Sequence, residues 1–258
     1  MKRQQGFTLI ELLVVVAMIG ILAGIIIPNV LNYLSRARAT RAVAEIKGID
    51  LALTKMLTDT NRQDFRSFFE IPTGSVFDGI SHTELAADPA LLKSAIAIYT
   101  NAFYILLKQG KNAEIDGADI VLNAEVRKKL GTAYMTDLGK DPWGNLYQFF
   151  PGPWRSSVNN PFVVREADVD IPGGYQLADA QVAFTDANGD TNALGFPAPR
   201  NETMYIYSLG ANLVSNQSFN EGFNVPNVDD ANYLGDEYVG GGDDVNSWDT
   251  QASWAPFY

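Results

Sequence analysis

The strongest constraint on this chain is an apolar segment close to its N-terminus. From Phe7 to Ile27 the only polar side chains are those of Thr8 and Glu11. As a helix, about 21 residues reach roughly 32 Å, which is enough to cross a bilayer. A carboxylate in such a helix costs free energy and is usually kept for a function. The sequence therefore predicts a long apolar helix in which Glu11 has a task.

Basic residues precede this segment and set its expected orientation. Lys2 and Arg3 favour an N-terminus in the cytoplasm, with the bulk of the chain across the membrane. A secretory signal is cleaved behind its apolar core, whereas here the small residue Gly6 stands in front of it. A plain signal anchor is the alternative reading, but it gives no role to Glu11.

The tetrad Gly6-Phe7-Thr8-Leu9, with Glu11 and Pro28 behind it, resembles the class III signal of type IV pilin-like proteins. The resemblance implies that a prepilin peptidase cleaves after Gly6 and that the new amine on Phe7 is methylated. It also implies that this amine pairs with Glu11 and sets each subunit's register in a filament, because a buried charge needs a partner. Pro28 removes one helical hydrogen bond, so we expect a kink or local melting near residues 24–29.

Beyond the proline the helical pattern becomes amphipathic. Apolar residues recur at helical spacing up to Leu57, with charged residues between them. We expect one continuous helix over residues 7–57, with one face on a globular head and the other towards neighbouring subunits. The apolar positions are Val30, Leu31, Leu34, Ala37, Val43, Ile46, Ile49, Leu53, Met56 and Leu57.

The composition excludes several kinds of site. The chain has no Cys, so disulfides, thiolate metal sites and Cys nucleophiles are ruled out. A net charge of −11 opposes nucleic-acid binding, which needs Lys and Arg against phosphates. We find no Ser-His-Asp set, zinc-ligand spacing or phosphate loop, and therefore expect no enzyme.

The middle of the chain, residues 58–135, is expected to be helical. Ser81-x-x-Glu84 fits a capping box, and Asp88-Pro89 fits an N-cap followed by Pro at the first helical position. That second helix should run to about Lys108 and stop at Gly110.

A shorter helix should begin after Asn123 and end near Leu130. The Tyr99–Leu107 cluster is expected in the core. His82 is the only histidine, and without an acid–nucleophile set it is expected in a surface or capping role.

Three motifs follow in the C-terminal half. Residues 141–149, DPWGNLYQF, predict a turn that leads into a strand. Residues 205–212 read YIYSLGAN, and residues 240–248 read GGGDDVNSW. In this order, behind that N-terminal signal, the motifs resemble those of the major pseudopilin of type II secretion systems.

In that family the last two segments bind calcium, so the resemblance implies a calcium site here. Its implied ligands are Asp243 and Asp244 through carboxylates, Leu209 through its carbonyl and Asn212 through its side chain, with Val245 or Ser247 adding oxygens. Hard oxygen ligands of this kind suit Ca²⁺. Asn212 stands where the family has Asp, which removes a charge, and residues 213–239 separate the two halves. The alternative is an acidic loop without an ion.

A weaker metal candidate stands apart from these motifs. Oxygen-bearing side chains stand at every second position, at Asp186, Asn188 and Asp190, and Gly189 precedes the last of them. This spacing is like the start of a calcium loop. Pro197 stands at the twelfth loop position, where an EF-hand has Glu. A simple turn is therefore the favoured interpretation.

Together these features predict an α+β pilin fold. A leader at 1–6 precedes a membrane-spanning assembly helix at 7–57. A head at 58–258 carries a small antiparallel sheet, enlarged by insertions at about 58–135 and 152–200.

The resemblance implies a structural filament subunit, the pseudopilus of a type II secretion system. It would first sit in the inner membrane and then in a periplasmic or extracellular filament. Its partners would be copies of itself, prepilin peptidase, an inner-membrane assembly platform and minor pseudopilins. A surface type IV pilus for adhesion or motility, and a membrane-anchored periplasmic enzyme, are the alternatives.

Overall fold

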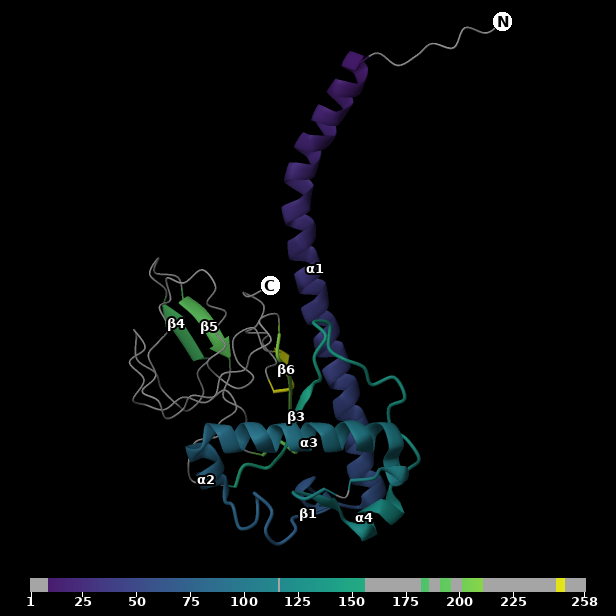
Figure 1. The fold of residues 1–258 in the computed structure, drawn as a ribbon, viewed down its shortest axis with the longest axis vertical. Helices are drawn as coiled ribbons and strands as arrows, with labels where there is room; N and C mark the ends of the chain where they lie inside the picture. Colours follow the sequence, from purple (N-terminus) through teal and green to yellow (C-terminus); the bar gives the residue numbers. More distant parts are fainter. Residues whose placement is uncertain are drawn as a thin grey trace, which may run out of the picture.

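A long helix joined to an α+β head makes up the molecule (Figure 1). The computed structural model describes residues 9–115, 117–155, 182–185, 191–195, 201–210 and 245–248. Gly6 and Phe7 lie outside these ranges. The expected class, α+β with a long N-terminal helix and small antiparallel sheets, is confirmed.

Helix α1 (Leu9–Thr60) is one 52-residue helix, about 78 Å long at 1.5 Å per residue. It passes Pro28 without a break, so the local melting expected near residues 24–29 is wrong for the single chain. A proline removes one backbone hydrogen bond and leaves the bonds of the flanking turns in place. Figure 1 shows α1 curving gently as it leaves the head. The helix also ends at Thr60, three residues beyond the expected Leu57.

The second half of α1 forms one wall of the head. Every third or fourth side chain is buried there, as a helix with one apolar stripe requires. The stripe begins later than expected, because Val30 and Leu34 are 53% and 46% exposed. The buried residues are Ala39, Ala42, Ile46, Ile49, Leu53 and Met56.

Two capped helices follow, as predicted. Helix α2 (His82–Ala87) begins with a complete capping box between Ser81 and Glu84. Helix α3 (Pro89–Gln109) begins with the Asp88 carboxylate accepting a hydrogen bond from the Leu91 backbone N–H, 3.0 Å away. A 3₁₀ turn, η2 (Gly110–Asn112), takes over at Gly110.

The rest of the insertion is small and mixed. Another 3₁₀ turn, η1 (Arg66–Phe68), leads into β1 (Phe69–Glu70), which pairs antiparallel with β2 (Val121–Leu122). This two-stranded sheet was not expected. Asn123 caps helix α4 (Ala124–Lys129) by accepting from the backbone N–H groups of Glu125 and Val126.

The main sheet has three antiparallel strands in the order β3-β6-β7. They are β3 (Gln148–Pro151), β6 (Met204–Ser208) and β7 (Val245–Asn246). β3 and β6 come from the predicted strand motifs. The central strand β6 is buried at all five positions, which is typical of a strand covered on both faces.

Helix α3 covers the outer edge of β3. The Phe149 N–H donates to Thr100 Oγ1 at 2.9 Å, and the Tyr147 N–H donates to the Tyr104 hydroxyl at 2.9 Å. Four helical residues span about 6 Å and two strand residues about 6.8 Å, so the two pairs match in spacing. These two N–H groups are thereby bonded, and α3 shields this edge of β3 from pairing with another chain.

Strands β4 (Val182–Thr185) and β5 (Thr191–Gly195) form a separate antiparallel hairpin within the second insertion. Asp186, Asn188 and Asp190 stand between its two strands, outside the described residues.

Close backbone contact requires a glycine at position 110. Gly110 has φ +53°, and a Cβ placed there would lie 2.0 Å from the Gly131 carbonyl oxygen. That oxygen also accepts from the Lys111 N–H at 2.7 Å. Gly74 has φ +86° but nothing within 4 Å of such a Cβ, so it is a matched control for the conformation alone.

We expect Gly110→Ala to destabilise the head much more than Gly74→Ala. The left-handed conformation costs a non-glycine residue about 1–2 kcal/mol in both variants. Gly110→Ala must also displace a backbone carbonyl and weaken its hydrogen bond, which adds about 1–3 kcal/mol. Urea unfolding of the full chain in detergent measures both. Equal losses of stability would contradict the close approach.

Candidate functional site: the assembly helix and the end of the sheet

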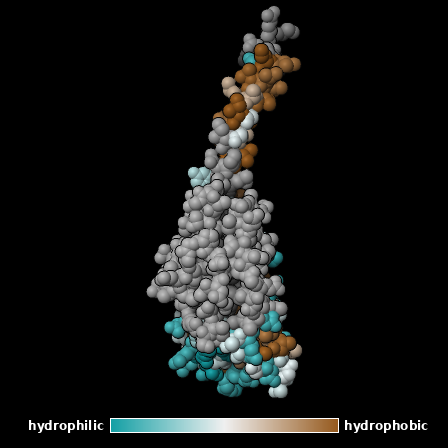
Figure 2. Space-filling model, turned by 90° about the vertical axis from the view of Figure 1, so that its left-hand side faces the viewer, coloured by the Kyte–Doolittle hydropathy of each residue, from teal (hydrophilic) through white to brown (hydrophobic). Residues whose placement is uncertain are grey.

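The first half of α1 is an apolar surface that the head does not cover. Leu9, Leu12 and Ile21 are 81%, 62% and 68% exposed, and Figure 2 shows the brown, hydrophobic surface along the protruding helix. Glu11 lies in its first turn and is exposed as well. Exposed apolar surface of this extent marks a contact with other helices or lipid.

The sequence predicted that the apolar half of α1 spans a membrane. Among the residues that the structure describes, no helix meets the length and hydropathy of a membrane-spanning segment.

A hydrogen-bonded relay fixes α1 to the sheet. The Glu45 carboxylate accepts from Arg41 Nε at 2.7 Å and from the Tyr147 hydroxyl at 2.5 Å. Tyr147 is buried, and burial, followed by the bond to Glu45, raises the pKa of its phenol. The Tyr104 hydroxyl, which binds the Tyr147 N–H, donates to the Gly139 carbonyl at 3.0 Å. The helix and the strand β3 are therefore held in one orientation.

Asp141 organises the turn that leads into β3. Its Oδ1 accepts from the backbone N–H groups of Trp143, at 3.0 Å, and Asn145, at 2.8 Å. Its own N–H donates to the Asn145 carbonyl at 2.8 Å, and its carbonyl accepts from the Gly144 N–H at 3.0 Å. Asp and Asn favour such turns because their side chains bind the backbone two residues on.

The second oxygen of Asp141 reaches the central strand. Its Oδ2 accepts from the Ser208 hydroxyl at 2.6 Å, and both side chains are buried. Ser208 Oγ in turn accepts from the Gly210 N–H at 3.3 Å. The DPWGN turn is thus bonded directly to the YSLGA segment.

Strand pairing brings the predicted calcium segments to the same end of the sheet. Ser208, at the end of β6, pairs with Val245, at the start of β7. Leu209 follows Ser208 directly and is half-buried. Ser247 lies farther along: its N–H donates to the Ile206 carbonyl at 2.9 Å, and its Oγ accepts from the Ile206 N–H at 3.3 Å.

The other predicted ligands lie outside the described residues. These are Asn212, Asp243 and Asp244, and the weaker set Asp186, Asn188 and Asp190. Within the described residues, no group of three or more His, Asp and Glu side chains is arranged to hold a metal ion.

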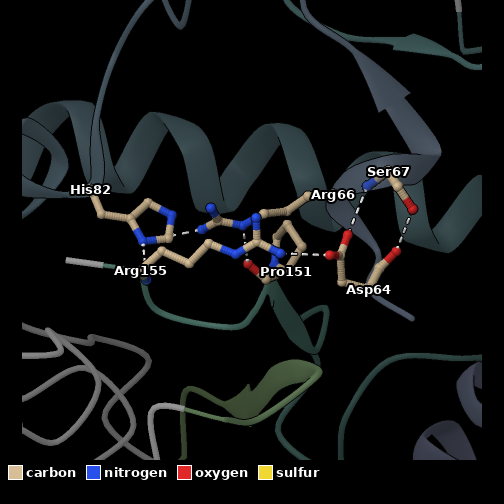
Figure 3. Close-up of polar contacts among 6 residues, drawn as sticks. All are labelled: Asp64, Arg66, Ser67, His82, Pro151 and Arg155. Carbon is tan, nitrogen blue, oxygen red and sulfur yellow. Dashed lines mark hydrogen bonds and ion pairs between the residues drawn. The ribbon is translucent and has the colours of Figure 1, made fainter. Parts of the chain in front are cut away.

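The sequence interpretation missed a charged cluster around His82 (Figure 3). His82 is only 8% exposed, so the expected surface role is wrong. Its Nδ1 accepts from the Arg155 N–H at 2.8 Å and faces Arg66 Nη2 at 3.2 Å, and its ring stacks on Trp154 with centroids 4.3 Å apart. No local sequence signal marks this cluster, because the partners of His82 lie 16 and 73 positions away in the chain.

Known proteins match both the N-terminal signal and the head. The family described as "Prokaryotic N-terminal methylation motif" matches residues 1–27. Type II secretion system core protein G of Pseudomonas aeruginosa is 27% identical over 191 residues, covering 72% of this chain and 97% of that protein. The core protein G of Escherichia coli is 30% identical over 142 residues, covering 49% and 95%.

Fimbrial proteins match over a shorter stretch. A fimbrial protein of Pseudomonas aeruginosa is 56% identical over 52 residues, which cover 20% of this chain. The match spans about a third, 34%, of that protein's own length. No solved structure gives a significant match.

The bond between Asp141 and Ser208 predicts strong coupling. Asp141→Ala leaves three donors without their acceptor and should cost about 3 kcal/mol of unfolding free energy, and Ser208→Ala about 1–2 kcal/mol. In the double variant the losses should fall short of their sum by about 1–2 kcal/mol. Urea unfolding of the wild type, the two single variants and the double variant measures this coupling. The exposed Asp137→Ala is the control and should change little; additive losses would contradict the bond.

Proposed function

Because this chain belongs to the family of type II secretion system core protein G, we propose that it is a structural subunit of a helical pilus-like filament, the pseudopilus of a type II protein secretion system. The family consists of structural subunits, so the proposed function is assembly rather than catalysis. The observation that carries it is the exposed apolar half of α1, attached to a folded head.

In this proposal lipid covers the apolar half of α1 in the precursor, and neighbouring copies of the helix cover it in the filament. The precursor is anchored in the inner membrane with its N-terminus in the cytoplasm, as Lys2 and Arg3 favour. Prepilin peptidase cleaves after Gly6, and the Phe7 amine is methylated. The assembly platform and the minor pseudopilins then help to transfer the helix from lipid into a bundle of its copies, where apolar surface stays covered.

Glu11 gives this bundle its register. An unpaired carboxylate among apolar helices is costly, and pairing with the Phe7 amine of a neighbouring subunit offsets that cost. Only one axial position of the incoming helix makes the pair. Pro28, inside α1, is the place where the helix can loosen when it is packed among copies.

A surface type IV pilus is the less favoured alternative. The core protein G relatives of Pseudomonas aeruginosa and Escherichia coli are matched along 97% and 95% of their length, whereas the fimbrial protein is matched along 34% of its length.

We also propose that the end of the sheet holds a calcium ion. The Ser208–Val245 pair supports this, because it brings Leu209, which follows Ser208, to the end of the sheet where β7 begins and Asp243 and Asp244 precede it in the chain. The proposed ligands are Leu209, Asn212, Asp243, Asp244 and Val245; Ser247 is less well placed, since its Oγ faces Ile206. The donors are hard oxygens, which suit Ca²⁺. The ion would tie the segment of residues 240–248 to β6.

Glu11→Val tests the assembly proposal. We expect normal cleavage and methylation but few or disordered filaments, because the register contact is lost. Mass spectrometry of the N-terminus reports processing, and electron microscopy reports filaments. Thr8→Val is the matched control, since it removes the other polar side chain of the segment without removing a charge. Normal filaments from Glu11→Val, or a mature chain that retains residues 1–6, would overturn the proposal.

Calorimetric titration of the full chain in detergent tests the calcium proposal. Asp243→Ala should abolish calcium binding, and Asp186→Ala should leave it intact. Calcium at 100 times its Kd should stabilise the wild-type head by about 2.7 kcal/mol. Binding that disappears with Asp186→Ala instead would move the site to the 186–190 segment. No heat from the wild type would remove the site.

A further inference from the structure

The head carries a second feature, away from the exposed apolar half of α1 (Figure 1). A pocket of about 120 Å³ opens between α3, α2 and the β1 region. Aromatic and aliphatic side chains form most of its wall, among them Phe69, Phe77, Tyr99 and Phe150. An apolar cavity of about 150 Å³ holds benzene, so this pocket has room for about one aromatic ring.

The pocket has a cation on its wall. Arg66 lines it, and the guanidinium is held by the Pro151 carbonyl, 3.4 Å from Nε, and by His82 Nδ1, 3.2 Å from Nη2 (Figure 3). Both partners are uncharged. In the part of the chain that the structure describes, no carboxylate forms an ion pair with Arg66.

The neighbouring groups do not neutralise this charge. Asp64 is engaged by the Arg155 guanidinium at 2.7 Å and by the Ser67 N–H at 3.0 Å. His82 is neutral, because burial and then the charges of Arg66 and Arg155 lower its pKa to about 3. Two guanidinium groups and one carboxylate therefore leave an excess positive charge beside the pocket.

Desolvation makes that charge expensive. Arg66 is partly buried, and this burial lowers its pKa from the ordinary value. A guanidinium nevertheless stays protonated in proteins. A buried charge without a counter-ion costs free energy, and an arriving carboxylate would recover part of it through a short, charge-assisted hydrogen bond.

The surroundings of the pocket favour a protein partner over a small molecule. Ile71 lines the pocket and is 46% exposed, and Val76, next to Phe77, is 55% exposed. An apolar rim around an arginine and an aromatic-lined pocket is the usual composition of a protein–protein contact. A free carboxylate would leave this rim uncovered.

We propose that this pocket binds a second polypeptide, taking one aromatic side chain into the cavity while a neighbouring Asp or Glu of that polypeptide pairs with Arg66. The aromatic ring supplies apolar area and the carboxylate supplies specificity. A segment without the acid would leave the guanidinium desolvated and unpaired, so it would be rejected. The first insertion forms most of the site, and Phe150 and Pro151 of β3 complete it.

The test uses the full chain in detergent micelles and an acetylated, amidated peptide, Gly-Glu-Phe-Gly, with fluorine on its ring. Fluorine NMR titration measures the Kd. We expect the wild type to bind this peptide at least about tenfold more tightly than the Gln-for-Glu peptide, the difference expected for a hydrogen bond to a charged group. Arg66→Gln should lose the same factor. Lys93→Gln, which removes an exposed positive charge from α3, should lose nothing.

Ile71→Glu is a second variant for the same titration, for the case in which Arg66→Gln does not fold. This half-exposed position tolerates an acid, which would repel the peptide and compete for Arg66, so binding should weaken about tenfold or more. No binding by the wild type, equal binding of the Gln peptide, or Ile71→Glu binding like the wild type would each overturn the proposal. Tighter binding of free 3-phenylpropanoate than of the peptide would overturn the assignment to a protein partner.

Discussion

The pairing of β6 on both of its edges is the interaction on which the rest of the head depends. β6 joins β3, about 55 residues earlier in the chain, and β7, about 40 residues later. Its five residues are all buried, so strand pairing must supply hydrogen bonds that water cannot reach. This register brings Asp141 to Ser208 and Leu209 to the start of β7. A shift by one residue would move every β6 side chain to the opposite face of the sheet and separate all these contacts.

Helices α3 and α1 turn this small sheet into a rigid base for the assembly helix. A three-stranded sheet is marginal alone and needs a packed face. Thr100 and Tyr104 occupy the free edge of β3, while Glu45 of α1 holds Tyr147 at its start. A load on the apolar half of α1 is therefore passed to the sheet through hydrogen bonds and packing, rather than through a flexible linker. That property suits a subunit whose helix is bundled while its head stays on the outside.

The sequence predicted those features whose signal is local. The capping box at Ser81, the cap at Asp88 and the strands β3 and β6 each depend on neighbouring residues. The β1–β2 pair joins segments about 50 residues apart, and no periodicity in two-residue strands reveals such a partner. The local melting expected near Pro28 is absent from α1, because local rules state the cost of a proline but not the stability of the flanking turns. The charged cluster at His82 arises only from tertiary packing.

The position of the first insertion explains how the head can be enlarged without disturbing assembly. Figure 1 places α2, α3, β1 and α4 at the end of the molecule opposite the N-terminus. The apolar half of α1 stays clear of them, since the large apolar side chains that the structure describes there, from Leu9 to Leu34, are exposed. The Arg66 pocket belongs to this remote end. A contact there and the bundling of α1 use separate surfaces of the molecule, so each can be selected without weakening the other.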